Sequence, residues 1–272
     1  MRRCWWPRVS LCKSGDWQQS AHSFYFDAHE PYLPPAPFDT QFGQKAANNN
    51  ARVTHRPRMA WRSNREKISP RENQAEMNAY DGAIAYLDQQ LGLLFAELDR
   101  RGSLKNTLVI ITSDHGEAFG ERGHYAHSDN LYLTLLHVPL LISFPARVPA
   151  GKSVAHPVSL RDIPATVMDL IGPDDRRRFP GRSLARYWNG GQDADDFIPI
   201  LSEVNLAPLH PHKFAAGSKA ITRSLVVGRY HYIKNHDGRE ELYDFINDPA
   251  EARDLSGYAG GRGVIEAFRK LL

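Results

Sequence analysis

The run TLVIITS, from Thr107 to Ser113, constrains the fold more than any other stretch of this sequence. It is continuously apolar and rich in β-branched residues, which is typical of a strand buried on both faces of a parallel sheet. The runs VPLLISF, from Val138, and FIPILSE, from Phe197, are interpreted in the same way. Helical patterns alternate with these strands, so we expect an α/β fold in which helices flank a central, mostly parallel sheet.

A helix with complete start and stop signals is expected between Pro70 and Gly102. Ser69 is the predicted N-cap, Pro70 takes the first helical position, and Glu72 completes a capping box. Gly102 is the predicted stop. The apolar residues that recur at three- and four-residue steps, and so share a face that would cover the sheet, are Met77, Tyr80, Ile84, Leu87, Leu91, Leu94 and Leu98. A second helix is expected in RDIPATVMDLIG, residues 161–172.

After about residue 205 the pattern changes, because SLVVGRYHYIKN and REELYDF alternate apolar and polar residues around a turn-forming HDG. Such alternation predicts an antiparallel hairpin with one buried face. We therefore divide the chain into an atypical N-terminal lead over 1–22, an α/β domain over 23–204, and a small C-terminal α+β subdomain over 205–272.

Composition excludes some classes of function. The 272 residues carry a formal charge of only +3, which argues against a nucleic-acid partner. The first residues are basic but lack the apolar run of a signal peptide, and nothing downstream approaches the roughly 18 consecutive apolar residues of a membrane span. We expect no membrane span, while compartment and oligomeric state stay open.

Polar residues gather where two predicted strands end. Asp27, His29 and Glu30 follow the β-prone FYF, and Asp114 and His115 follow TLVIITS. Ligands of open α/β sheets bind at the carboxyl ends of strands. Asp114 and His115 could reach one cation there, although two ligands are too few for a divalent ion that binds oxygen.

Further imidazoles surround this position. His124 and His127 follow in a glycine-containing loop, and His29 comes from the other strand end. Histidines that donate hydrogen bonds and carry protons suit an anionic substrate. The residues alone therefore suggest metal-assisted hydrolysis of an anionic ester.

Four segments, taken in order, resemble the second half of a sulfatase of the alkaline phosphatase superfamily. They are FYFDAHEPYLPP, YDGAIAYLDQQLGLLFAELDRRG, TLVIITSDHGEAFGERG with the following VPLLI, and ELYDFINDPAEARDLS. The resemblance implies an alkaline-phosphatase-like sandwich with a small C-terminal antiparallel lobe, and it makes residues 23–204 part of the catalytic domain.

The resemblance also implies roles for individual residues. Asp114 and His115 match metal ligands, with calcium the metal most often bound and manganese or zinc as alternatives. His29 matches a histidine that contacts the sulfate group or the leaving oxygen. His127 matches a position that is often lysine in sulfatases and histidine in relatives that transfer phosphoryl groups. Both histidines are thus expected to be catalytic and to bind substrate, which would be a small-molecule or glycan sulfate ester.

One part of the family pattern is not found. Sulfatases carry an upstream Cys-x-Pro-x-Arg motif whose cysteine becomes formylglycine, and neither Cys4 nor Cys12 stands in such a motif. We therefore expect neither cysteine to be the nucleophile and expect an N-terminally truncated form of a sulfate-ester hydrolase. Two alternatives remain open: a phosphoester or phosphonate hydrolase or phosphoryl transferase of the same superfamily, and a non-catalytic remnant. Truncation would leave a strand edge unpaired, which predicts poor solubility of the isolated chain unless it dimerises.

Overall fold

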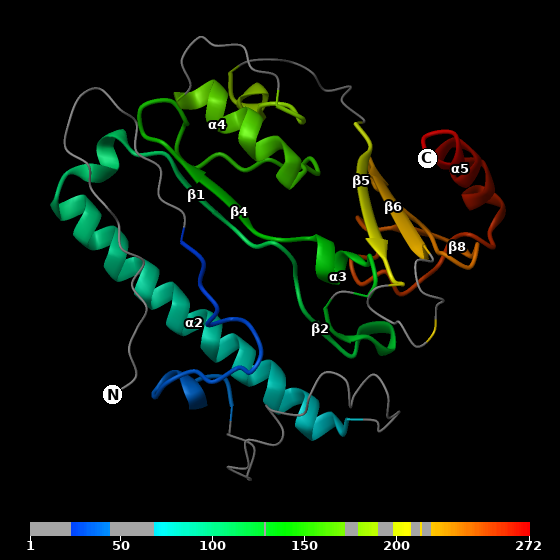
Figure 1. Cartoon of the computed structure of the whole chain (residues 1–272), viewed down its shortest axis with the longest axis horizontal. Coiled ribbons are helices and arrows are strands. Elements are labelled where there is room, and N and C mark those ends of the chain that lie inside the picture. The colour runs from blue at the N-terminus through cyan, green and yellow to red at the C-terminus, as the bar shows by residue number, and fades with distance from the viewer. Residues whose placement is uncertain are drawn as a thin grey trace. The chain divides into compact units, whose positions relative to one another are not determined.

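The computed structural model describes residues 23–43, 68–127, 129–171, 179–189, 198–207, 213 and 219–272, and Figure 1 shows their helices and strands. They belong to two compact units, the first ending at Leu94 and the second beginning at Phe95. The predicted lead over 1–22, with Cys4 and Cys12, lies outside the described residues. The predicted domain boundaries after residues 22 and 204 remain predictions.

The long helix α2, Pro70–Arg100, begins and ends where the sequence predicts. The backbone N–H of Ser69 donates to Glu72 Oε2 at 3.0 Å, and the backbone N–H of Glu72 donates to Ser69 Oγ at 3.2 Å. This reciprocal pair satisfies two backbone donors that the first turn leaves without helical partners. Gly102, at φ 70°, takes the left-handed conformation of a C-terminal stop and leads into η2, Ser103–Asn106. The predicted helix is confirmed.

The buried face of α2 is narrower than the sequence predicts. Its buried residues are Glu76, Gly82 and Ala83, whereas Ile84 of the expected apolar face is 40% exposed. A Cβ built on Gly82 would lie 2.4 Å from the carbonyl oxygen of Phe38, so the earlier segment lies directly on the helix backbone there. Close approach of two backbones therefore selects small residues at this contact, and apolar periodicity does not reveal it.

Residues 23–43, which contain η1 (Phe38–Thr40), form no strand. The prediction of a strand at FYF is wrong: Phe24 is 84% exposed and Phe26 is 73% exposed. A strand must pair its backbone groups, and no described strand pairs with this segment. The segment packs on α2 through ring contacts instead, such as Tyr32 against Tyr80 with ring centroids 5.2 Å apart.

In the second unit, β1 (Val109–Thr112) and β4 (Leu140–Ser143) form a two-stranded antiparallel sheet, with Ile111 opposite Leu141. The sequence predicts parallel pairing and burial on both faces for these runs, and the observed pair corrects that expectation. The side chains of β1 are only partly buried, and Leu141 is 58% exposed. An apolar run specifies a strand but not the direction of its partner, and a long loop can return the chain antiparallel.

The loop between β1 and β4 contains a small hairpin followed by a short helix. Its elements are β2 (Ala118–Phe119), η3 (Glu121–Gly123), β3 (Tyr125–Ala126) and α3 (Leu133–Leu136). Gly116 joins the start of this loop to α3, because its N–H donates to the carbonyl of Leu135 at 2.8 Å. A Cβ at Gly116 would lie 2.1 Å from the carbonyl oxygen of Thr134. The glycine of SDHGE is therefore required by close packing.

A helical layer follows β4. Its elements are η4 (Leu160–Asp162), α4 (Ile163–Ile171) and η5 (Leu184–Tyr187). The hydroxyl of Thr166, which is fully buried, accepts from the backbone N–H of Leu184 at 2.9 Å and so joins α4 to η5. The predicted helix at 161–172 is confirmed over the residues described. In the described part of the chain, no helix is long and apolar enough to cross a membrane.

The C-terminal sheet has four antiparallel strands in the order β5-β6-β7-β8, and α5 follows it. Their bounds are β5 (Ile200–Asn205), β6 (Ile221–Val227), β7 (Tyr230–Lys234), β8 (Glu240–Asp244) and α5 (Ala259–Arg269). Leu225, Tyr232 and Leu242 are paired across three strands, and Ile265 and Phe268 of α5 cover them. The predicted antiparallel lobe is confirmed, whereas FIPILSE, expected in the central sheet, supplies β5 of this one.

The other face of this sheet is buried as well, which the sequence does not predict. It carries Ser224, His231, Glu241 and Tyr243, all of them buried polar or aromatic residues. Polar residues at every second position indicate a solvated face, but here the hairpin and α3 lie against it. Figure 1 shows α3 beside this sheet.

Candidate active site

The end of β1 presents Asp114 and His115 as predicted. Ser113 Oγ donates to the carbonyl of His115 at 2.7 Å, and the backbone N–H of His115 donates to Asp114 Oδ1 at 3.1 Å. These bonds turn the backbone so that two adjacent side chains face the same way. The side chain of Asp114 is 89% exposed and that of His115 is 36% exposed.

The geometry of this pair fits a shared cation. His115 Nδ1 lies 2.8 Å from the carbonyl oxygen of Gly116, and because a carbonyl can only accept, Nδ1 carries the proton. The Nε2 of the neutral ring then has a lone pair for a metal. Nε2 lies 3.9 Å from Asp114 Oδ1, within the separation of about 3–4.5 Å expected for two donors on one ion.

Two donors do not complete such a site. Among the described residues, no group of three or more His, Cys, Asp or Glu side chains could hold a metal ion. Asp114 and His115 therefore offer two donors, and their role as metal ligands remains a prediction.

The hairpin brings Glu117 and His127 together. β2 and β3 pair Ala118 with Ala126, so the residues before and after the hairpin meet at its open end. His127 Nδ1 lies 3.2 Å from both carboxylate oxygens of Glu117. The two side chains are 9% and 5% exposed. Glu117 thus fixes the orientation of the ring, which directs Nε2 away from the carboxylate.

His127 also lies against the metal-ligand candidate. Its ring centroid is 3.9 Å from that of His115, with the rings tilted by 30°. The structure therefore brings together three of the predicted site residues, Asp114, His115 and His127, and adds Glu117. His124 takes a different neighbour, since its Nδ1 lies 3.6 Å from Asp129 Oδ1.

His29 belongs to the first unit and has contacts with residues close to it in sequence. Its Nδ1 lies 2.7 Å from the carbonyl oxygen of Glu30, and its backbone N–H donates to the carbonyl of Phe26 at 3.1 Å. The ring of Phe26 contacts the imidazole edge-on at 6.1 Å. These contacts fix the orientation of the ring, so that Nε2 points away from the carbonyl of Glu30.

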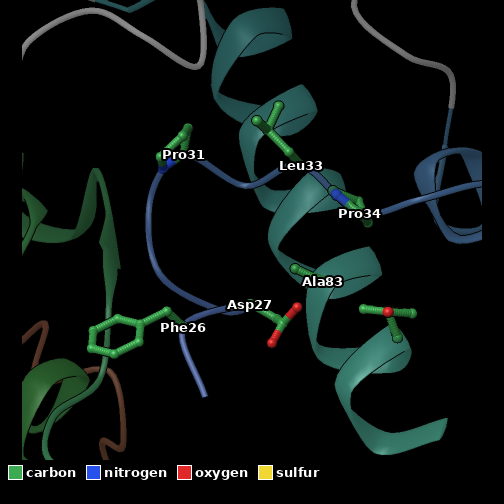
Figure 2. Close-up of a pocket in the computed structure, with 7 residues that line it drawn as sticks. Phe26, Asp27, Pro31, Leu33, Pro34 and Ala83 are labelled. Atoms are coloured by element: carbon green, nitrogen blue, oxygen red, sulfur yellow. The ribbon is translucent and has the colours of Figure 1, made fainter. Parts of the chain in front are cut away.

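A shallow pocket of about 190 Å³ lies in the same unit, between the DAHEPY segment and α2 (Figure 2). The residues that line it are Phe26, Asp27, Pro31, Leu33, Pro34, Ala83 and Tyr86. It combines apolar and aromatic surface with a single carboxylate, and its position in sequence beside His29 makes it a candidate for part of a substrate site.

One buried carboxyl in the first unit has a strongly shifted acidity. Burial, together with the smaller effect of the charge of Glu30, raises the pKa of Glu76 from 4.5 to about 7. The shift makes this group titrate near neutral pH.

Sequence reasoning missed Glu117 as a site residue. It stands in the same SDHGE motif, but its partner lies on the far side of the hairpin. The signal that could have revealed it is the pair of glycines Gly120 and Gly123, both at positive φ, which closes a short turn between Glu117 and His127.

Comparison with solved structures shows that the fold is alkaline-phosphatase-like. The chain is similar to a phosphonate monoester hydrolase of Agrobacterium radiobacter at a TM-score of 0.70 and 24% identity, covering 89% of this chain and 53% of that one. It is also similar to a structure in complex with its substrate D-glucosamine-2-N,6-O-disulfate, at a TM-score of 0.61 and 21% identity, covering 79% and 43%. At these identities the likeness shows the fold.

The family follows from sequence. The family model described as Sulfatase matches residues 19–173, and the chain belongs to that family. It is 28% identical to a sulfatase of Formosa agariphila over 72% of this chain and 35% of that protein. It is 31% identical to a choline-sulfatase of Rhizobium meliloti over 71% of this chain and 36% of that protein. The chain thus matches about a third of the length of these relatives.

Proposed function

We propose that this chain forms part of a hydrolase of sulfate esters that works with a divalent metal. Membership of the sulfatase family supports the reaction class. The observation that carries the proposal is the pair at the end of β1, in which Asp114 Oδ1 and His115 Nε2 lie 3.9 Å apart. A carboxylate and an imidazole at that separation suit one cation.

Asp114 and His115 would hold the metal together with further ligands. The resemblance favours calcium, while an imidazole nitrogen also suits manganese or zinc. Such an ion, when bound, supplies positive charge that stabilises the oxygens of a tetrahedral anion and the attacking oxygen. No residue of this chain is assigned as the formylglycine nucleophile, and N-terminal truncation stays a prediction.

The histidines would act on the substrate. Glu117 directs His127 so that Nε2 can meet the sulfate group beside the metal, and a donor in this place stabilises charge that develops on an oxygen. His29 would contact the sulfate group or protonate the leaving oxygen. The names of similar proteins support a small-molecule or glycan sulfate ester as substrate.

Paramagnetic broadening tests the metal site in the whole chain. Mn²⁺ added to protein labelled at its histidines should broaden the His115 signals first. Calcium or zinc should displace the Mn²⁺ and restore these signals. Asp114→Asn should abolish the effect, and His115→Ala should abolish the broadening of the neighbouring His127 signals, whereas Asp99→Asn, an exposed aspartate of α2, should leave the broadening unchanged. Broadening that persists in Asp114→Asn would contradict the proposal.

Sulfate titration tests the anion site in the same samples. With calcium or zinc present, sodium sulfate should shift the signals of His127 and of the neighbouring His115. His127→Ala should retain Mn²⁺ broadening at His115 but lose the sulfate-dependent shift of the His115 signals. His137→Ala, at an exposed histidine, is the matched control. Absence of sulfate binding by the wild-type chain at millimolar concentration would favour the non-catalytic remnant.

A phosphonate or phosphate ester is the second candidate substrate. Histidine stands at 127, where sulfatases often have lysine, and the fold is shared with a phosphonate monoester hydrolase. Competition between sodium sulfate and phenylphosphonate for the His127 shift distinguishes the two. Tighter binding of the phosphonate would select this alternative.

A further inference from the structure

Three non-glycine residues of the described chain have positive φ, and they lie in one neighbourhood. They are Arg122 at 54°, Ala126 at 63° and Glu251 at 52°. A side chain in the left-handed region costs roughly 1 kcal/mol or more, so such residues persist where the surrounding contacts determine them. Arg122 forms the tip of the hairpin, Ala126 precedes His127, and Glu251 follows β8.

Arg122 joins the hairpin tip to the C-terminal sheet. Its Nη1 donates to the carbonyl oxygen of Glu251, and its Nη2 donates to Tyr243 Oη at 2.6 Å. The guanidinium also lies over the rings of Tyr132 and Tyr243, 4.6 and 4.8 Å from their centroids. The side chain is 26% exposed, so most of it is removed from water.

Glu251 joins the same sheet to α3. Its carboxylate, in a residue 2% exposed, accepts from the backbone N–H of Leu133 through Oε2 at 2.8 Å. Its Oε1 is paired with Nδ1 of His231 on β7. One residue therefore contacts the hairpin through its main chain and α3 through its side chain.

Glu241 of β8 completes the arrangement. Its Oε2 accepts from Tyr132 Oη at 2.9 Å and from Tyr243 Oη, and its Oε1 accepts from Asn235 Nδ2 at 2.7 Å. Burial and the adjacent carboxylate of Glu241 raise the pKa of Tyr243, which keeps its phenol neutral and able to donate. Buried networks in which most polar groups are paired favour one conformation over alternatives, and here the adjoining His231 has a buried Nε2 without a partner among the described residues.

We propose that this polar clasp, formed by Arg122, Tyr132, Glu241, Tyr243 and Glu251, positions His127 for the reaction. Arg122 fixes the tip of the hairpin, and Glu251 fixes α3, the helix that follows it. The end of the hairpin that carries Glu117 and His127 is thereby held in the conformation in which these two side chains are in contact. Arg122 and Glu251 are positioning residues, because neither contacts a reacting group. The role assigned to the clasp rests on the proposed function, whereas the arrangement of the clasp rests only on the contacts described above.

Two readouts of the hairpin test the clasp without requiring activity. The first is hydrogen exchange at the amides of Gly120 and His124, which donate to the carbonyls of His124 and Glu121 at 2.8 and 2.9 Å. The second is the ¹⁵N signal of His127 Nδ1, which reports the bond to Glu117. Both are measured on the full chain, with exchange in β6 and β7 showing that the sheet stays folded.

Arg122→Ala should raise exchange in the hairpin about tenfold or more and remove the Nδ1 signature of the Glu117 bond, while β6 and β7 keep their protection. Arg122→Gly should do the same even though it relieves the positive φ, because the guanidinium contacts are lost. Glu251→Gln should loosen the start of α3, because it removes the charge that holds the Leu133 amide, while the main-chain contact of residue 251 with Arg122 remains. Arg223→Ala, which removes an exposed ion pair with Glu203 on the same sheet, is the matched control.

Unchanged hairpin exchange and an unchanged His127 signal in both Arg122→Ala and Glu251→Gln would overturn the proposal. Loss of protection in β6 and β7 in both Arg122→Ala and the milder Arg122→Lys would also overturn the proposal. It would mean that Arg122 stabilises the whole sheet and has no specific effect on the hairpin. With metal present, the clasp variants should weaken sulfate binding about tenfold while Mn²⁺ broadening at His115 persists. A wild-type chain that binds no sulfate contradicts the proposed function, while the hairpin readouts still decide the clasp.

Discussion

At the scale of single residues, the chemistry of the site could be predicted in part. The sequence predicts Asp114 and His115 from their place after a β-branched run and His127 from the glycine-containing loop that follows, and the structure brings the three side chains together while their roles remain predictions. Glu117 could not be identified as their companion, because its contact with His127 depends on the register of a hairpin of two-residue strands. Residue type shows which chemistry is possible, whereas pairing decides which groups meet.

The buried Glu117–His127 pair should contribute to stability. Glu117→Ala leaves a buried imidazole without its carboxylate partner, so the free energy of unfolding should fall by about 1–3 kcal/mol. Glu266→Ala, at an exposed glutamate of α5, should change it by no more than about 0.5 kcal/mol. Urea unfolding measures both variants, and equal values for the two would contradict the assigned contact.

Glu76 should make stability depend on pH near neutrality. Its pKa in the folded chain is about 7, above the value of 4.5 for a free carboxyl, so the folded state binds more protons between those values. Stability from this group is complete at low pH and is lost as the pH rises toward and through 7. Glu76→Gln should flatten the unfolding free energy between about pH 4.5 and pH 7, the range of the shift. Parallel profiles for wild type and variant would be inconsistent with the shift.

At the scale of elements, local signals predicted helices well and strand partners poorly. The capping box at Ser69 and the stop at Gly102 lie within the sequence of α2 itself, and both are present. The direction of β4 relative to β1, and the absence of a strand at FYF, depend on what lies beside each segment. The polar second face of the C-terminal sheet is likewise buried only because the hairpin and α3 lie against it.

Two glycines of α2 should respond in opposite directions to the same change. Gly92 is exposed and a Cβ there meets nothing within 4 Å, so Gly92→Ala should stabilise the helix by about 0.5–1 kcal/mol. Gly82→Ala places its Cβ 2.4 Å from the carbonyl oxygen of Phe38 and should destabilise by about 1–3 kcal/mol. Thermal unfolding of both variants tests the packing, and a stabilising Gly82→Ala would contradict it.

At the scale of the whole molecule, the chain combines a recognisable fold with exposed apolar surface. It matches 35% and 36% of the length of the two relatives named above. In the described ranges, β1 and β4 form a sheet of only two strands, and Leu141 on β4 is 58% exposed. Short sheets with open edges and apolar side chains favour pairing between chains.

The purified chain should therefore self-associate as its concentration rises. Leu141→Lys places a charge on the exposed side of β4 and should reduce association without disturbing β1, because charged residues on open strands oppose pairing. Leu93→Lys, at an exposed position of α2, is the control for added charge alone. Light scattering across a concentration series is the measurement. Equal reduction by both variants would show that the strand edge is not responsible.

The contacts of Glu251 also bear on how the protein is made. This residue lies 129 positions after Arg122 and 118 after Leu133, the two residues that it joins. At a synthesis rate of about 5–20 residues per second, the hairpin would leave the ribosome on the order of ten seconds before Glu251 exists. Until then the nascent chain carries the residues of the site without the partner that orders them, so its final shape is reached only when the last segment emerges.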